Sequence, residues 1–474
     1  MNPIIVWFRQ DLRLSDNPAL IHAVKSKRPV VCLYVHDDET PKDWRWGSAS
    51  RWWLHKSLES LSAELKRKGG KLVLRKGNAD AILMKLATDS KAEAICWNRC
   101  YEPFAIARDK KLKSDLAEDG IEVQSFNSAL LFEPWELKTK AGGPFRVFTP
   151  FWRAAQELPP PEAPCPVPRE IEFYKHRLTS DALSDWKLLP TNPDWAGGLR
   201  DAWMPGEEGA RVRLSRFVQS IGNYSEGRDR PDRDDTSRLS PHLHWGEISP
   251  RQVWHAVNSH AAEHGSGDGF LSEIGWREFS YHLLFSNPRL PERPLREEFS
   301  NFPWHDSEKN LHAWTKGNTG IPIVDAGMRQ LWQTGWMHNR VRMIAASFLI
   351  KHLMIDWRRG AEWFWDTLVD ADLANNSASW QWVAGCGADA APFFRIFNPV
   401  LQGEKFDASG DYVRRFVPEL AKMPGSHIHK PWAAGKDTLS KAGVKLGENY
   451  PHPIVDLAQG RERAISAFKS LRKA

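Results

Sequence analysis

The sequence predicts an α/β domain followed by an all-helical domain, with a long linker between them. Short β-rich runs alternate with amphipathic segments over residues 1–130, prolines gather in the irregular stretch 131–205, and helical periodicity dominates residues 206–474. Strand–helix alternation predicts a doubly wound parallel sheet with right-handed crossovers. A chain of 474 residues is too long for a single core, which agrees with this division.

Strands and helices are expected to alternate throughout the N-terminal domain. The strands are Ile4–Phe8, Val30–Val35, Lys71–Arg75, Ala94–Trp97 and Glu122–Phe126, and the helices are Pro18–Ser26, Ser48–Lys68, Ala79–Ser90 and Phe104–Asp119. Asn17 is the expected cap of the first helix, with Pro18 in its first turn. The domain is Rossmann-like, but its first strand is followed by Arg9-Gln10-Asp11-Leu12-Arg13-Leu14 and not by a GxGxxG phosphate loop.

The rest of the chain is expected to be a linker and then a helical bundle. Pro159, Pro160, Pro161, Pro164, Pro166 and Pro168 are typical of an extended connector. Apolar residues at three- and four-residue spacing predict helices over Val253–Ala261, Leu271–Phe285, Pro322–Thr334, Arg340–Leu353 and Arg358–Leu368. No convincing strand interrupts this series.

Composition excludes several classes of protein. No apolar run approaches the roughly 18 residues that a membrane span needs. The five cysteines are odd in number and lack CxxC spacing, so we expect a reducing compartment and no metal site. The N-terminus enters a strand without a basic leader, which favours a cytoplasmic protein over a secreted one. A net charge of +6 permits a polyanionic partner without requiring one.

Tryptophan is heavily used, with 24 residues in the chain, and most are expected to be core or surface filler. Two of them lie in the stretch Asp370–Trp382, where acids and amides precede Trp380, and Trp357, Trp363 and Trp365 lie shortly before it. An indole offers a large apolar area, a stacking face and one N–H donor, and it is readily oxidised. Such a cluster can therefore move electrons as well as pack.

Two Ser-Pro junctions, Ser240-Pro241 and Ser249-Pro250, predict helix starts, each with the serine as cap. Together with Thr236, Ser237 and Arg238, the first start offers backbone N–H groups, hydroxyls and a guanidinium. This combination suits a phosphate or pyrophosphate. The alternative is that both serines are helix caps and nothing more.

The segment Gly335–Met343 is predicted to lie on a helix, so that Asn339, Arg342 and Met343 share a face. Arg342 has apolar neighbours and is expected to pair with Asp370 or Asp372, because a buried unpaired charge is prohibitive. Such a pair beside amides could hold a cofactor ring, although a structural salt bridge explains it equally well.

These segments together resemble the photolyase/cryptochrome flavoprotein family over essentially the whole chain. The matching motifs, in the family's order, are Trp7–Asn17, Thr236–Ser240, Trp276–Phe279, Gly320–Asp325, Gly335–Met343, Asp370–Trp382 and Phe394–Pro399. The resemblance implies an α/β antenna domain, a linker and a helical domain that binds FAD, which agrees with the pattern described above.

The resemblance also assigns roles to matching positions. The FAD-binding positions are Tyr224, Thr236, Ser237, Arg238, Leu239 and Ser240 for the phosphates, Asn339, Arg342, Asp370 and Asp372 for the flavin ring, and Asn376 for flavin nitrogen five. The electron-transfer positions are Trp380, Trp357 and Trp304. The DNA- or lesion-contacting positions are Glu273, Trp276, Arg277, Asn339, Arg340, Met343, Trp382 and Gln402; Glu273, Met343 and Asn376 are expected nearest the chemistry.

Within the family the sequence favours repair of cyclobutane pyrimidine dimers. The implied enzyme is a monomeric bacterial carbon–carbon lyase, in which excited, reduced, anionic FAD passes an electron to a flipped-out dimer in single- or double-stranded DNA. The (6-4) photolyases carry histidines where this chain has Asn339 and Met343. Plant cryptochromes, the signalling alternative, tend to have Asp in place of Asn376 and a long tail, whereas this sequence ends soon after Pro453–Asp456.

The N-terminal domain resembles the bacterial class III photolyases and plant cryptochromes more than class I photolyases, on the evidence of Gly47–Leu54 and Cys96–Pro103. An antenna chromophore is implied, either 5,10-methenyltetrahydrofolate or a deazaflavin, with Glu102 as a contact or as a solvated helix start. Two interpretations are open for the basic residues Arg228, Arg230 and Arg233: they face the DNA, or they lie in a solvated loop. His242 and His244 are expected to be ordinary core or surface histidines.

Overall fold

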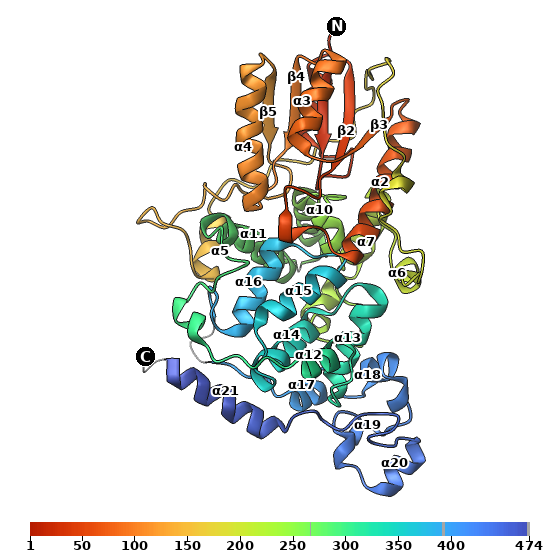
Figure 1. The fold of residues 1–474 in the computed structure, drawn as a ribbon, viewed down its shortest axis with the longest axis vertical. Coiled ribbons are helices and arrows are strands. Elements are labelled where there is room, and N and C mark those ends of the chain that lie inside the picture. Colours follow the sequence, from red (N-terminus) through yellow and green to blue (C-terminus); the bar gives the residue numbers. More distant parts are fainter. Residues whose placement is uncertain (266, 391–393, 472–474) are drawn as a thin grey trace. The chain divides into compact units, whose positions relative to one another are not determined.

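The computed structural model describes residues 1–265, 267–390 and 394–471 (Figure 1). Its contacts divide the chain into two compact units. The first unit comprises Met1–Gly222, Ser237–Pro288 and Val369–Asp372, and the second comprises Asn223–Thr236, Arg289–Leu368 and Leu373–Ala474. The two units are defined by their internal contacts and not by function. The predicted functional domains, with boundaries 1–130, 131–205 and 206–474, therefore stay a prediction. No helix in the described ranges is long and apolar enough to cross a membrane.

The first unit contains a five-stranded parallel sheet in the order β3-β2-β1-β4-β5. Its strands are β1 (Ile4–Phe8), β2 (Val30–His36), β3 (Leu72–Lys76), β4 (Ala94–Asn98) and β5 (Glu122–Phe126). The intervening helices are α1 (Pro18–Lys25), α2 (Ser48–Arg67), α3 (Ala79–Ser90) and α4 (Pro103–Glu118). The predicted doubly wound topology is confirmed, and Asn17 caps α1 by accepting a hydrogen bond from Leu20 N at 3.1 Å.

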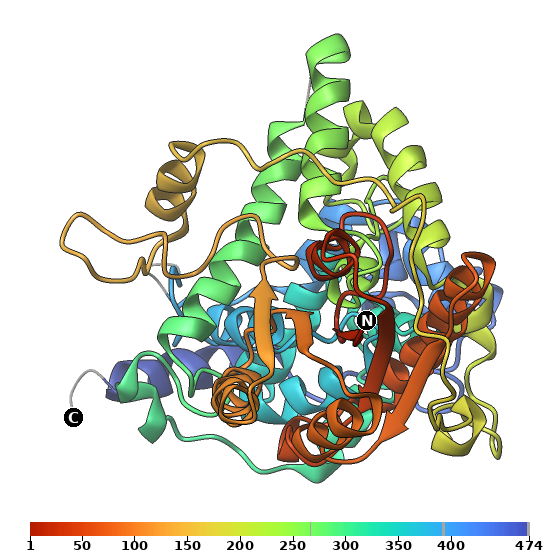
Figure 2. The same cartoon turned by 90° about the horizontal axis from the view of Figure 1, so that it is seen from above.

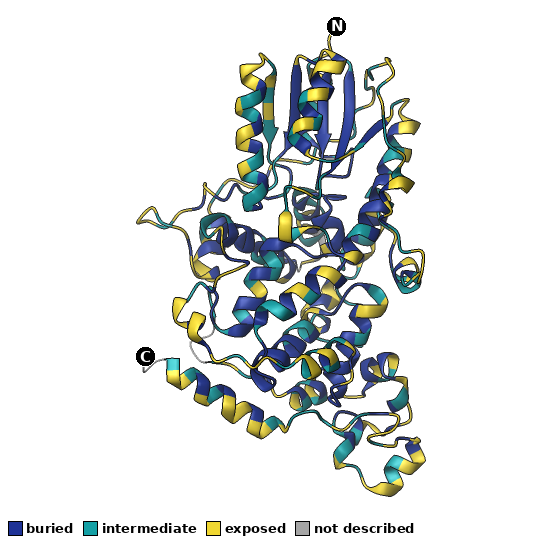
Figure 3. Ribbon diagram, in the orientation of Figure 1, coloured by how far each residue is buried: buried dark blue, intermediate teal, exposed yellow. Residues whose placement is uncertain are grey.

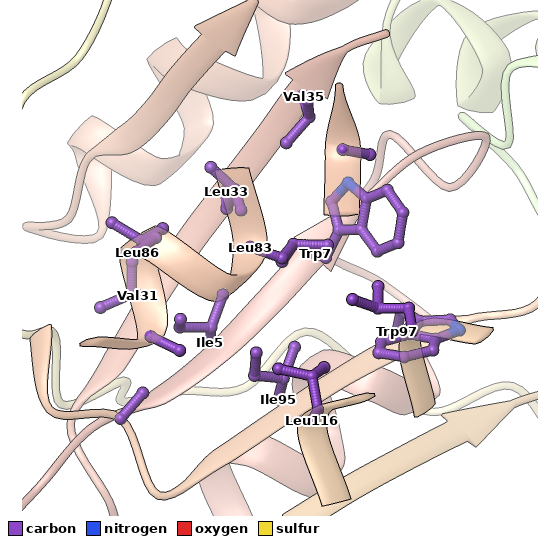
Figure 4. Packing of buried hydrophobic residues seen from close by; sticks show 14 of the residues in the cluster. Ile5, Trp7, Val31, Leu33, Val35, Leu83, Leu86, Ile95, Trp97 and Leu116 are labelled. Atoms are coloured by element: carbon purple, nitrogen blue, oxygen red, sulfur yellow. The ribbon is translucent and has the colours of Figure 1, made fainter. Parts of the chain in front are cut away.

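The sheet is buried because helices cover both of its faces. Trp7 of β1 and Trp97 of β4 meet edge to face, with ring centroids 5.7 Å apart, in a core that α3 and α4 complete with leucines (Figure 4). Helix α1 lies across the opposite face (Figure 2). The strands accordingly read as continuous apolar runs, and Figure 3 shows β1, β2 and β4 buried along their lengths.

The order of the strands reverses between β1 and β4. In an open α/β sheet, ligands bind beyond the carboxyl ends of the strands at such a point. Here those ends lead into Arg9 and Gln10 after β1, and into Cys100 and Glu102 after β4.

Further helices of the first unit are α5 (Phe148–Gln156), α6 (Gly197–Ala202), α7 (Glu207–Gln219), α9 (Ser240–His244), α10 (Pro250–His264) and α11 (Asp268–Ser286). The expected irregular linker thus includes two short helices, α5 and α6. Ser249 caps α10, as predicted, and it also forms a capping box with Gln252.

The second unit is helical. Its helices are α8 (Tyr224–Gly227), α12 (Glu308–Thr315), α13 (Pro322–Thr334), α14 (Asn339–Ser347), α15 (Trp357–Thr367), α16 (Leu373–Ala384), α17 (Pro399–Phe406), α18 (Asp411–Phe416), α19 (Gly425–Ile428), α20 (Lys436–Ala442) and α21 (Leu457–Leu471).

Two predictions for this unit are wrong in detail. The expected helix Arg340–Leu353 is α14 followed by a π-helical turn over Phe348–His352. The expected helical segment Gly335–Met343 begins to be helical only at Asn339, because Gly335 adopts a left-handed conformation with φ of 64° and ends α13.

Candidate functional site

Asp372 lies at the centre of a buried polar cluster in the first unit. The hydroxyl of Tyr281 donates to its Oδ2 at 2.5 Å, and His244 Nδ1 lies 3.4 Å from the same oxygen. Burial alone would raise the pKa of Asp372, but the hydrogen bonds from His244 and Tyr281 and the charge of Arg277 hold that pKa well below its ordinary value. The site therefore offers an ionised carboxylate in an apolar setting.

His244 presents a second polar group in this cluster. Its Nε2 atom is buried and has no hydrogen-bond partner among the described residues. The ring packs edge-on against Trp46 and Trp245, with centroids 5.4 Å and 5.0 Å away. A buried nitrogen without a protein partner is uncommon, and it fits a polar group of a bound ligand.

Ser240 contributes to the same unit in a way that the sequence did not predict. Helix α9 begins at Ser240, so Leu239 occupies the N-cap position. No side chain of the described residues makes a capping hydrogen bond there. The Ser240 hydroxyl donates instead to Asp370 Oδ2 at 2.6 Å. The expectation that Ser240 is a capping serine is therefore wrong, because a carboxylate distant in sequence takes up its hydroxyl proton.

The backbone just before α9 is unusual. Arg238 has a φ of 49°, in the left-handed region that residues other than glycine rarely adopt. The Ser237 hydroxyl accepts a hydrogen bond from Leu239 N at 3.3 Å. Such conformations persist where the surroundings hold them, and they are frequent in binding sites.

Helix α11 carries Glu273, Trp276 and Arg277. Glu273 and Trp276 are half-buried and lie three residues apart, on one face of the helix. The indole of Trp276 stacks on Phe148 of α5, with centroids 3.9 Å apart and an interplanar angle of 9°. Only part of the indole surface therefore remains open.

Arg277 makes its contacts within the first unit. Its Nη1 donates to the Ala129 carbonyl at 2.7 Å and to Glu278 Oε1 at 3.2 Å. The guanidinium also lies 5.0 Å above the Tyr281 ring. A role for Arg277 in DNA binding stays a prediction, but in this structure the side chain is 11% exposed and holds the backbone at Ala129.

Glu102 immediately precedes α4, beyond the carboxyl end of β4, where the strand order reverses. It is 5% exposed and accepts a hydrogen bond from Gln10 Nε2 at 3.0 Å. Burial raises the pKa of this carboxyl. The interpretation of Glu102 as a solvated residue at a helix start is therefore wrong, because its side chain is buried.

Helix α14 of the second unit carries Asn339, Arg340, Arg342 and Met343. Arg342 Nε donates to the Met337 carbonyl at 2.7 Å. Arg340 pairs with Asp229 at 2.7 Å and lies 4.5 Å above the Phe406 ring. The pairing of Arg342 with Asp370 or Asp372 stays a prediction.

Helix α16 carries Asn376 and Trp380. Asn376 Nδ2 donates to the Ala361 carbonyl of α15 at 3.1 Å, which fixes the orientation of the amide. Trp380 is 3% exposed and meets Phe364 edge-on at 5.0 Å. A Cβ at Gly360 would lie 2.2 Å from Trp380 Cη2, so α15 requires a glycine there.

The other two members of the predicted electron chain also belong to the second unit. Trp357 is buried with 1% exposure, whereas Trp304 is half-buried and packs against Phe302 with centroids 4.3 Å apart. The burial of these rings suits a route that starts inside the unit and ends near its surface. The order of transfer itself stays a prediction.

The remaining predicted residues are divided between the units. Tyr224, with Arg228 5.4 Å above its ring, and Thr236 belong to the second unit. So do Trp382, whose Nε1 donates to the Asp389 carbonyl at 3.1 Å, and Gln402 of α17. Ser237, Arg238, Leu239 and Ser240 belong to the first unit with Asp370 and Asp372.

Two residues of the cluster were missed or undervalued in the sequence. Tyr281 follows Arg277 by four residues on α11, so helical spacing from Arg277 was the available signal. His244 was expected to be an ordinary histidine, and its contact with Asp372 and its buried Nε2 atom distinguish it.

Known proteins identify the class to which this fold and these residues belong. Residues 4–169 match the family described as DNA photolyase, and residues 270–470 match the FAD binding domain of DNA photolyase. The chain belongs to the photolyase/cryptochrome family.

Individual members of the family show which proteins the chain is similar to over its full length. The chain is 56% identical to the deoxyribodipyrimidine photo-lyase of Agrobacterium fabrum, over 99% of this chain and 98% of the relative. It is 40% identical to cryptochrome-1 of Arabidopsis thaliana, over 98% of this chain and 70% of that protein. A bacterial class III photolyase structure from Agrobacterium tumefaciens superposes with a TM-score of 0.97 at 55% identity, covering 100% of this chain and 98% of that one.

Proposed function

We propose that this protein is a class III photolyase that uses light and reduced FAD to split cyclobutane pyrimidine dimers in DNA. The observation that carries the proposal is the likeness at 55% identity to a class III photolyase structure, over both chains almost in full. The cryptochrome alternative has less support, because identity to cryptochrome-1 falls to 40%. Asn339 and Met343 disfavour a (6-4) photolyase, whose histidines they replace.

The residues of the first unit fit FAD. Asp372 is ionised and buried, Asp370 is buried and hydrogen-bonded to Ser240, and His244 Nε2 is available to a ligand. A flavin ring and its ribityl chain carry N–H and O–H groups that such acceptors bind. When bound, reduced FAD supplies the electron that light promotes, and the protein supplies geometry and electrostatics.

In the second unit, Arg342, Asn339 and Asn376 are assigned to the flavin ring. The guanidinium of Arg342 would stabilise negative charge on the reduced ring. Asn376 is held by its bond to the Ala361 carbonyl, so its amide would face nitrogen five in one orientation. Tyr224, Thr236 and Ser237–Ser240 would hold the phosphates.

The lesion-binding residues would work on an extruded dimer. A dimer lies inside a duplex and must leave the stack before it can react, and the damaged step is cheaper to unstack than a normal one. Trp276 and Trp382 would give apolar walls to the flipped bases, and Met343 a further apolar contact. Glu273, on the same face of α11 as Trp276, would accept a hydrogen bond from the imide N–H of the lesion and so orient it.

An antenna chromophore is assigned to the first unit, with 5,10-methenyltetrahydrofolate preferred over a deazaflavin. Glu102 supports this assignment, since its buried carboxyl follows the strand end where the strand order reverses. The partner is UV-damaged DNA, single- or double-stranded, and we assign the protein as a cytoplasmic monomer.

A direct test uses the purified full-length protein. Its absorption spectrum should show flavin and a second chromophore, and illumination with a dimer-containing oligonucleotide should restore the intact thymines. Chromatography of released chromophores identifies the antenna. A protein that stays colourless and takes up no FAD, or that binds FAD yet leaves dimers unchanged after chemical reduction, would contradict the proposal.

A further inference from the structure

The stacked contact between Phe148 and Trp276 joins the linker to the proposed lesion-binding helix. The two rings are 3.9 Å apart at 9°, which is a face-to-face arrangement. Trp152, one helical turn further along α5, lies nearly parallel to Phe148, with centroids 6.3 Å apart at 11°. Trp276, Phe148 and Trp152 therefore form a slab of three nearly parallel rings.

The slab is fixed by its contacts within the first unit. A Cβ at Gly275 would lie 2.5 Å from Trp152 Cε3, so α11 can receive this indole only because residue 275 is glycine. Phe151 of α5 packs against Phe279 of α11 at 5.1 Å. The backbone N–H of Phe145 donates to His282 Nε2 at 2.9 Å, which ties the chain before α5 to the same helix.

One face of the Trp276 indole is thus occupied, and its edge meets Phe279 at 5.9 Å and 74°. Trp276 nevertheless remains half-buried, so the open part of the ring is available to a ligand. A ring whose plane is set before binding loses little conformational entropy when a base stacks on it.

The charge of residues 138–153, which include the start of α5, is compatible with DNA at this surface. Residues 138–153 contain Lys138, Lys140, Arg146 and Arg153 and no acidic residue. All four cationic side chains are exposed. A phosphate backbone can therefore approach α5 without meeting negative charge from this segment.

The geometry points to Phe148 as a positioning residue for lesion recognition: it backs one face of Trp276 so that the other face receives one pyrimidine of the dimer. This inference rests on the proposed function. It makes the linker part of the recognition surface and predicts that a flat ring at position 148 is required, beyond the apolar volume that it fills.

The test compares Phe148→Leu with Phe148→Tyr in the full-length holoprotein. The probe is a single-stranded thymine oligonucleotide with one cyclobutane dimer, and the same oligonucleotide without damage. Leucine keeps an apolar side chain but removes the stacking face, so the preference for damaged over undamaged DNA should fall roughly 2- to 10-fold. Tyrosine keeps the ring and should retain the wild-type preference.

Phe145→Leu is the matched control, because Phe145 is a buried linker aromatic that packs on Phe151 and His282. It should leave the preference for damaged DNA unchanged. Repair yield at saturating DNA should be unaltered in every variant, because Phe148 acts through Trp276 and not on the reaction. If Phe148→Leu does not fold, Phe148→Met is measured in its place.

The results distinguish a failure of the inference about Phe148 from a failure of the proposed function. If the wild type repairs dimers but Phe148→Leu keeps full preference, or Phe145→Leu loses as much, Phe148 has no positioning role. If the wild type neither prefers nor repairs damaged DNA, the proposed function is wrong. A selective loss in Phe148→Leu, restored by tyrosine, supports both.

Discussion

The hydroxyl of Tyr281 lies 2.5 Å from Asp372 Oδ2, in the interior of the first unit. The same oxygen is 3.4 Å from His244 Nδ1. His244 of α9 and Tyr281 of α11 thus both contact the carboxylate of Asp372, which lies about 90 residues or more further along the chain. Their effect is to keep Asp372 ionised where burial would otherwise neutralise it.

Tyr281→Phe should weaken this arrangement. Losing the donor leaves a buried carboxylate less satisfied, at a cost of about 1–3 kcal/mol in unfolding free energy. Because the pKa of Asp372 is depressed in the folded state, its stabilisation is complete above the unfolded carboxyl pKa and is lost as pH falls. In the variant the folded-state pKa of Asp372 should be less depressed, so the acid loss should begin at the same pH, end at a higher pH and be smaller in total. Thermal unfolding across acid pH measures it.

A control for this variant is available in the same unit, since Tyr101 donates to Glu133 Oε2 at 2.8 Å. Tyr101→Phe should cost comparable stability but leave FAD retention intact, whereas Tyr281→Phe should lower both. Equal FAD retention in the two variants would remove Asp372 and its donors from the cofactor site.

Glu278→Gln should change the pH dependence of stability in the opposite sense. Burial raises the pKa of Glu278 to about 7, although Arg277 and the N–H groups of Leu131 and Phe132 oppose the shift. The folded protein therefore holds this proton more tightly than the unfolded chain, and stability falls as pH rises from about 4.5 to about 7. The total is on the order of 3 kcal/mol.

Glutamine keeps an acceptor for Leu131 N and removes the titration. The unfolding temperature of the variant should therefore decline less between acid and neutral pH than that of the wild type. An unchanged pH slope would mean that Glu278 is already ionised throughout this range.

Glu273→Ala should lower the repair quantum yield roughly 10-fold, because the hydrogen bond that orients the imide N–H of the lesion is lost. FAD content should be normal, since the residue is assigned to the lesion. Ser272→Ala, at the preceding position of α11, is the control and should repair normally. Wild-type yield in the Glu273 variant would exclude this residue from the chemistry.

Trp357→Phe should slow the photoreduction of oxidised flavin, because phenylalanine is much harder to oxidise than tryptophan. Repair by enzyme that has been reduced chemically should be unaffected. Trp254→Phe, which alters an indole outside the predicted chain, should change neither rate. A collapse of repair in pre-reduced Trp357→Phe would show that Trp357 has another role.

The sequence predicted most of the secondary structure because local signals were strong. Strands such as Ile4–Phe8 are buried on both faces and read as apolar runs, and Ser249 has its capping partner three residues away. The Ser240 cap failed because the competing partner, Asp370, is 130 residues distant. No local pattern reports such a contact.

The residues of the candidate site could be named from the sequence, and their contacts could not. Family motifs named Asp372 and Trp276, whereas the contacts of Tyr281 with Asp372 and of Phe148 with Trp276 join segments far apart in sequence. Glu102 shows the same limit, since burial decided between a solvated helix start and an internal carboxyl.

The four residues Val369–Asp372 complete a unit that otherwise ends at Pro288. Trp245, Ser240 and Tyr281 each hydrogen-bond to this short segment, through Val369 O, Asp370 and Asp372. During synthesis on the ribosome, the first unit therefore cannot form these three hydrogen bonds until residue 372 has been made. A fragment cut after Pro288 would present three donors with nothing to receive them, so dissecting the protein into independently expressed halves should fail.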